Sequence, residues 1–78
     1  MEKLLRVLIG PLVEDEKSIE IVKQEDGENR VNFLVSIPQK DIAKVIGKEG
    51  KMIKAIKNLL KIRAFKEGVY VTVEVREK

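Results

Sequence analysis

The amino-acid sequence predicts an α+β fold in which a helix is followed by two strands, two helices and a third strand. Three observations indicate this order. Apolar residues recur at helical spacing at the N-terminus, they alternate with polar residues in three later segments, and two glycines interrupt a helical stretch before the last of these segments. At 78 residues the chain suits one domain, which buries only about 60–65% of the surface that its unfolded form exposes. We expect a three-stranded mixed sheet with the helices on one face.

The first helix is predicted over about residues 1–13, because apolar side chains recur there three or four positions apart. Gly10 and Pro11 should weaken or kink it, since proline lacks a backbone donor and clashes with the preceding turn. Packing of this helix on its own sheet is the simpler expectation, and docking onto a partner is the alternative. The apolar residues concerned are Leu4, Leu5, Leu8, Ile9 and Leu12.

Charged residues interrupt this N-terminal segment, and no small-residue cleavage site follows it. With these features it is poorly formed as a signal peptide. It is also too short to span a bilayer. The chain contains no cysteine, which excludes disulfides and thiolate metal sites. We expect a cytoplasmic protein that does not enter membranes.

Two strands joined by a turn should come next. Residues 18–24 alternate well enough for a strand, and residues 25–29, EDGEN, are typical of a turn in which Gly27 takes a positive φ. Residues 30–37, RVNFLVSI, then form the second strand of an antiparallel hairpin. The apolar face of this second strand carries Val31, Phe33, Val35 and Ile37.

Pro38 ends the second strand and can begin a short helix, and Asp41 in its first turn suits the positive end of the helix dipole. After the two glycines, a longer helix is predicted to about residue 63 from a run of apolar positions. The apolar residues of the two helices are Ile42, Val45 and Ile46, then Met52, Ile53, Ala55, Ile56, Leu59, Leu60 and Ile62.

Residues 69–75, VYVTVEV, form the clearest strand, with valines on one side and polar residues on the other. A crossover through helices normally joins parallel strands, so the second and third strands should be parallel neighbours. The sheet face away from the helices should meet solvent. It should carry Asn32, Ser36, Thr72 and Glu74.

The positive charge of the chain is concentrated in one segment. Residues 39–66 carry nine basic and two acidic side chains, whereas residues 1–38 have a net charge of −3 and residues 67–78 a net charge of −1. This asymmetry indicates a surface that faces a polyanion.

The two-glycine segment, KVIGKEGKMIK, lies in the middle of this basic region. Gly47 can end the short helix and Gly50 can let the chain enter the next one, so a tight corner is the simplest interpretation. However, the loop leads into a helix N-terminus, which favours anions, and its glycines allow a sugar-phosphate backbone to approach closely. A lysine stripe is more often a solvated face, but directly behind such a loop it favours phosphate binding. The stripe consists of Lys51, Lys54, Lys57 and Lys61.

Other chemistries lack the necessary residues. The loop is not a nucleotide-triphosphate loop, because Val45 and Met52 occupy the positions that require glycine and Ser/Thr. The chain has no histidine or cysteine, and its acidic clusters lie in turn-like segments. We expect no enzyme activity, no cofactor and no metal site.

The segment Val45–Gly50, VIGKEG, resembles the I-G-x-x-G signature of KH domains. The element order resembles the type II arrangement, with a helix at about 1–13 and a KH core at about 30–76 within a single domain spanning 1–78. More narrowly, the chain is similar to the small bacterial single-KH RNA-binding proteins of the KhpA type.

This resemblance implies binding of single-stranded RNA or DNA in a groove formed by the two helices, their loop and the sheet edge. A Gly-x-x-Gly loop of this kind holds the backbone of about four nucleotides. The resemblance implies that Ile46 lines an apolar groove floor, that Gly47 and Gly50 permit close approach, and that Lys48 supplies charge. Glu49 places an acid in the loop. From charge and position alone, the candidate residues also include Lys44, Lys51 and Lys54.

The resulting expectation is a non-enzymatic RNA-binding protein, acting as an RNA chaperone or post-transcriptional regulator. Expected partners are RNA and, for avidity, a second copy of the chain or another KH protein. The alternatives are a protein-interaction module with a KH fold and little RNA affinity, and a DNA-binding helix–turn–helix protein. We also expect replacement of Gly47 and Gly50 by Asp to abolish binding without disturbing the fold.

Overall fold

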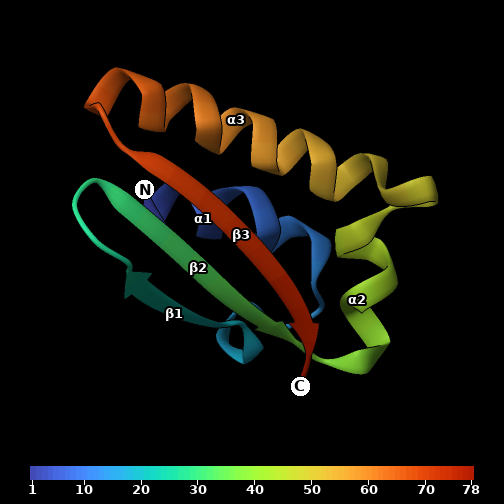
Figure 1. Cartoon of the computed structure of the whole chain (residues 1–78). Helices are drawn as coiled ribbons and strands as arrows, with labels where there is room; N and C mark the ends of the chain where they lie inside the picture. The colour runs from blue at the N-terminus through green and yellow to red at the C-terminus, as the bar shows by residue number, and fades with distance from the viewer.

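The computed structural model describes the whole chain, Met1 to Lys78, and confirms the predicted α+β order (Figure 1). Three short 3₁₀ turns occur in addition, after α1, before β1 and between α2 and α3. The elements are α1 (Glu2–Ile9), η1 (Gly10–Leu12), η2 (Glu16–Ser18), β1 (Glu20–Glu25), β2 (Arg30–Ile37), α2 (Gln39–Ile46), η3 (Lys48–Gly50), α3 (Lys51–Glu67) and β3 (Tyr70–Glu77).

The sheet has the order β1-β2-β3, with β2 in the centre. Strand β1 pairs antiparallel with β2, and β3 pairs parallel with it, so that Phe33 lies opposite Lys23 on one side and Val73 on the other. All three helices lie on the same side of this sheet (Figure 1). The mixed sheet predicted from the crossover is therefore confirmed, and β3 is an edge strand that runs beside α3.

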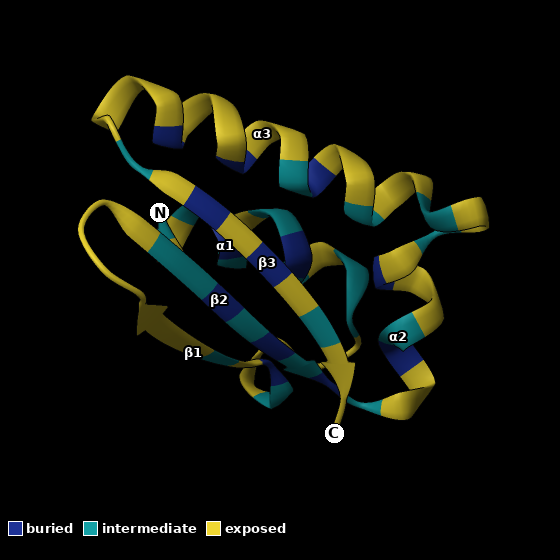
Figure 2. Cartoon of the chain, viewed as in Figure 1, coloured by how far each residue is buried: buried dark blue, intermediate teal, exposed yellow.

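The core lies between the sheet and the helices, as the buried segments in Figure 2 show. The alternation predicted for β2 and β3 is confirmed, because their odd-numbered apolar residues point into this layer. Leu5 and Ile9 of α1 are fully buried there, so α1 packs on its own sheet rather than offering these side chains to a partner. The buried apolar set is Leu5, Ile9, Ile19, Phe33, Val35, Ile37, Val45, Ile56, Leu60, Ala64, Val71 and Val73.

Some boundaries differ from the prediction for local reasons. Helix α1 stops at Ile9 and gives way to the 3₁₀ turn that contains Pro11, as the missing proline donor leads one to expect. Helix α3 continues past residue 63 to Glu67, because Ala64 keeps its buried face in register. It ends where Gly68 takes a left-handed conformation with φ of 72°.

The apolar run that predicted α3 is only partly buried. Met52, Leu59 and Ile62 are exposed, although they belong to the apolar run that predicted the helix. Only Ile56, Leu60 and Ala64 of this helix are buried, with Ile53 packing partly against the core. The helix is apolar on two sides, and periodicity cannot tell which side meets the sheet.

Candidate nucleic-acid interface

The loop between α2 and α3 begins with a glycine whose conformation only glycine adopts readily. Gly47 has φ of 79° and ψ of 174°, and its N–H donates to the Ala43 carbonyl at 2.8 Å. An added Cβ would lie 2.5 Å from Met52 Cβ and 2.9 Å from Met52 N. The loop's own packing against the start of α3 therefore requires a residue without a side chain at this position.

Gly50 lies in a different environment. It takes the left-handed conformation, with φ of 74° and ψ of 14°, and its N–H donates to the Gly47 carbonyl at 3.1 Å. An added Cβ would meet nothing within 4 Å. Open space therefore adjoins Gly50 at the first turn of α3, so this glycine is the one that leaves room for a ligand.

The expectation that Asp at both glycines would leave the fold intact is wrong for Gly47. Any side chain there would collide with the backbone and Cβ of Met52, which cannot rotate away. If such a variant lost RNA binding, the loss could come either from a missing loop–RNA contact or from a disturbed fold, and the experiment could not distinguish the two. Lys48 and Glu49, which are both exposed, are better positions for a test.

Glu49 is held in a conformation that favours glycine or asparagine. Its φ is 58° and its ψ 25°, in the left-handed region, which costs an L-residue roughly 1–2 kcal/mol. The carboxylate forms no ion pair with Lys48 or any other base. The sequence predicted an acid in the loop, and the structure adds that this acid is exposed, unpaired and held at a strained backbone position.

Helix α3 starts directly after this loop and runs for 17 residues. No side chain caps its N-terminus, although the Lys51 N–H donates to the Lys48 carbonyl of the preceding 3₁₀ turn. The partial positive charge of this helix end is therefore not compensated by an acceptor side chain. Such a terminus is suited to a phosphate group.

The candidate lysines surround this terminus. Lys44 lies on the last turn of α2, Lys48 in the loop, and Lys51 and Lys54 on the first turns of α3, and all four are exposed and form no ion pair. Ile46, at the end of α2, is 37% exposed. The loop, the helix terminus and unpaired positive charge therefore lie in one region.

One of these lysines has an acidic neighbour. The pKa of the Glu14 carboxyl is lowered from 4.5, mainly by a hydrogen bond from Lys40, whose Nζ lies 3.0 Å from Glu14 Oε2, and to a smaller degree by the charge of Lys44. The pKa of Lys40 is raised from 10.5 by the same pair. The Glu14 carboxylate is therefore paired mainly with Lys40, and Lys44 acts on it only as a more distant charge.

A groove follows α3 along the free edge of β3, and we refer to it as the α3–β3 groove. Its first hollow has a volume of about 160 Å³ and its second about 250 Å³, and Lys61 and Val71 line both. The first hollow is lined by Lys57, Lys61, Val71, Thr72 and Val73, and the second by Lys61, Ala64, Phe65, Val69, Tyr70 and Val71.

Sequence reasoning placed Lys57 and Lys61 in the lysine stripe but did not include them among the candidate site residues. In the fold they flank the buried side of α3, where they reach the apolar edge of β3. Neither forms an ion pair. Their helical spacing from Lys54 indicated that they share one side of α3. Which side of α3 faces the sheet had to be known before that side could be placed beside β3.

The structure brings together no three His, Cys, Asp or Glu side chains in an arrangement that could hold a metal ion. None of its helices combines the length and the apolar character needed to cross a bilayer.

Comparison with known proteins gives consistent matches over the whole chain. A family model described as "KhpA/KhpB, KH domain" matches residues 2–75. The chain is 33% identical over 78 residues to the RNA-binding protein KhpA of Chlamydia trachomatis and 36% identical over 78 residues to that of Chlamydia pneumoniae, covering 100% of this chain and 99% of each relative. It is 33% identical over 75 residues to the RNA-binding protein KhpA of Clostridium acetobutylicum, covering 96% of this chain and 99% of the relative.

Proposed function

Because this chain belongs to the KhpA/KhpB family of KH domains, we propose that it is a non-enzymatic protein that binds single-stranded RNA. The relatives named above carry the name of RNA-binding proteins, which supports this proposal. The observation that carries it is the open space at Gly50, beside an uncapped helix N-terminus and unpaired lysines. A phosphate of the RNA backbone fits this position.

In this proposal the RNA backbone rests on the loop from Gly47 to Gly50 and the strand then follows the α3–β3 groove. Lys48, Lys51 and Lys54 neutralise phosphates near the loop, and the bases lie over apolar side chains at the end of α2 and the edge of β3. Counterion release from these contacts makes the affinity strongly salt-dependent. Single-stranded DNA is the natural competitor, since it presents the same phosphates.

We assign the protein to the cytoplasm as an RNA chaperone or a post-transcriptional regulator. One small domain with a shallow groove binds RNA weakly, and such a protein gains affinity when two copies act on one strand.

The test replaces Lys48 and Glu49 by Asp, because both side chains are exposed and Asp tolerates the left-handed position of Glu49 better than most residues. Binding is measured by fluorescence anisotropy with random-sequence RNA of about 12 nucleotides, a length within the range that single-strand-binding domains cover. We expect at least a tenfold loss of affinity, with an unchanged circular dichroism spectrum.

A matched control makes the same two replacements at Glu16 and Lys17, an exposed pair in the 3₁₀ turn before β1. It changes composition and net charge identically, so a loss caused by charge alone would appear in both variants. Full binding by the folded loop variant would overturn the assignment of the loop.

A second candidate function is assembly through α3. Leu59 and Ile62 are large apolar residues that are 47% and 59% exposed on the side of α3 that does not contact the sheet. We propose that a second copy of this chain packs on this side. Sedimentation of wild type against Ile62→Asp tests it, and a wild-type protein that stays monomeric at high concentration would contradict it.

A further inference from the structure

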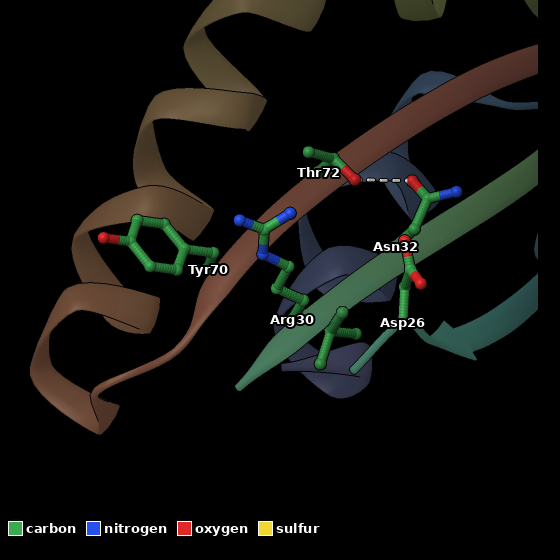
Figure 3. Close-up of a pocket in the computed structure, with 6 residues that line it drawn as sticks. Asp26, Arg30, Asn32, Tyr70 and Thr72 are labelled. Carbon is green, nitrogen blue, oxygen red and sulfur yellow. Dashed lines mark hydrogen bonds between the residues drawn. The ribbon is translucent and has the colours of Figure 1, made fainter. Parts of the chain in front are cut away.

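The face of the sheet that no helix covers carries a hollow of about 300 Å³ beside the start of β3 (Figure 3). We refer to it as the open-face hollow. It differs from the α3–β3 groove in being lined almost entirely by polar and aromatic side chains. These include Asp26, Arg30, Asn32, Tyr70 and Thr72.

The side chains of this hollow come from neighbouring strands in a fixed register. Arg30 lies opposite Tyr70, and Asn32 lies opposite Thr72. The Thr72 hydroxyl donates to Asn32 Oδ1 at 2.7 Å, and Asn32 Nδ2 donates to Gln24 Oε1 at 3.3 Å. This row of hydrogen bonds fixes the Asn32 amide, whose second N–H hydrogen is left to donate to a ligand.

Two groups in the hollow are available to a nucleotide. The Tyr70 ring is 75% exposed, although a tyrosine gains stability from burial. The Arg30 guanidinium forms no ion pair, and Figure 3 shows it lying between the Tyr70 ring and the Thr72–Asn32 pair. An exposed aromatic ring next to a free cation is a suitable surface for base stacking and phosphate contact.

The hollow adjoins the α3–β3 groove across the edge strand β3. Thr72 lines both the open-face hollow and the first hollow of the groove, and Tyr70 lines both the open-face hollow and the second hollow of the groove. Phe65, which is 86% exposed, lies with Tyr70 at the far end of the groove. The two exposed aromatic rings of the chain are thus found where the groove meets the open face.

We propose that the open-face hollow is a second nucleotide subsite, reached by an RNA strand that leaves the α3–β3 groove and passes around the edge of β3. This inference rests on the proposed RNA-binding function. A base stacks on Tyr70 and Arg30 contacts the adjacent phosphate. Asn32 donates to the base edge, and Asp26 accepts from a base amino group and disfavours a second phosphate. Stacking of bases on exposed aromatics of a sheet is an established way of holding single-stranded RNA.

The experiment compares two random-sequence RNAs by fluorescence anisotropy. One has about four nucleotides, the length that a Gly-x-x-Gly loop holds, and the other about 12, which reaches the open face. Tyr70→Ala should weaken binding of the longer RNA by about 5- to 150-fold and leave the shorter RNA unaffected. Tyr70→Phe keeps the ring and should bind the longer RNA as wild type does.

A second readout does not depend on a substitution. Tyr70 is the only tyrosine of the chain and there is no tryptophan, so its ring proton signals can be assigned without ambiguity. They report on the open-face hollow and on the second hollow of the groove, which Tyr70 also lines. These signals should shift with the longer RNA and stay in place with the shorter one.

The outcomes separate the subsite from the proposed function. If Tyr70→Ala binds the longer RNA as tightly as wild type and the ring signals do not move, the subsite is wrong while RNA binding stands. If the wild type binds neither RNA, the proposed function fails and the subsite with it. If the ring signals shift with protein concentration in the absence of RNA, the hollow is a contact between copies, which also overturns the subsite.

Discussion

Replacing Gly47 by Ala should destabilise the protein far more than replacing Gly50 by Ala. At Gly47 the backbone conformation costs a residue with a side chain about 1–3 kcal/mol. The methyl group would lie 2.5 Å from Met52 Cβ, and relief of such overpacking costs about a further 1–3 kcal/mol. The expected loss of about 2–6 kcal/mol is a large fraction of the roughly 5–15 kcal/mol that stabilises a typical domain.

At Gly50 only the left-handed backbone opposes alanine, since the added methyl meets no neighbour. That conformation costs roughly 1–2 kcal/mol, and the smaller entropy of the unfolded Ala chain offsets part of it. We therefore expect a loss of about 1 kcal/mol. This variant should remain folded and should bind RNA less tightly, because its methyl group occupies the open space proposed for phosphate.

The assay is urea unfolding followed by circular dichroism, which yields the free energy of unfolding of each variant. The result that refutes the reasoning is an equal loss of stability in the two variants, because it would mean that Met52 does not constrain Gly47. RNA anisotropy on the folded Gly50→Ala variant completes the comparison. Binding at the wild-type level would show that the space beside Gly50 is not where the ligand lies.

Three further predictions concern charged residues. Glu49→Asn should raise the free energy of unfolding by up to about 1 kcal/mol, since Asn tolerates the left-handed region, and should tighten RNA binding by removing an acid; weaker binding would contradict the second part. Replacing Lys57 and Lys61 by Gln should reduce the slope of log K against log salt by about 1 for each lysine that contacts a phosphate, and an unchanged slope would exclude both from the interface. Glu14→Gln should lower the melting temperature at neutral pH, and the difference from wild type should vanish on acidification.

The direction of the last effect follows from the two pKa shifts. The pKa of Glu14 is lowered, so its contribution to stability is complete above 4.5 and is lost as the pH falls through the lower value of the folded state. The pKa of Lys40 is raised, so its contribution is complete below 10.5 and is lost as the pH rises through the higher value. A difference between wild type and Glu14→Gln that stays constant into strong acid would show that the ion pair is not its cause.

The strands and the loop were largely predictable because their signals are local. Strand β2 has the predicted bounds, since the alternation between Arg30 and Ile37 is interrupted at once by a turn on one side and Pro38 on the other. The positions of Gly47 and Gly50 were predictable for the same reason.

The unpredicted features depend on tertiary packing. Glu49 has no intrinsic preference for a left-handed backbone, and it adopts one because the loop must join two helices whose directions the core determines. Likewise, the lysine stripe of α3 was visible, but only the burial of Ile56, Leu60 and Ala64 decides that Lys57 and Lys61 turn toward β3. The roles of the two glycines could not be distinguished until the position of Met52 was known.

The parallel pairing of β2 and β3 gives the loop a part in folding. Strand β3 cannot reach its place beside β2 until α2, the loop and α3 have crossed over the sheet, and contacts so far apart in sequence form slowly. Gly47 forms the turn between the two helices of that crossover and packs closely against Met52 of the second one. We therefore expect substitutions there to slow refolding as well as to lower stability, whereas changes at the exposed tip, Lys48 and Glu49, leave the refolding rate nearly unchanged. Lys48 and Glu49 can therefore be changed to suit a ligand without slowing folding, because Gly47 alone provides the backbone turn that folding requires.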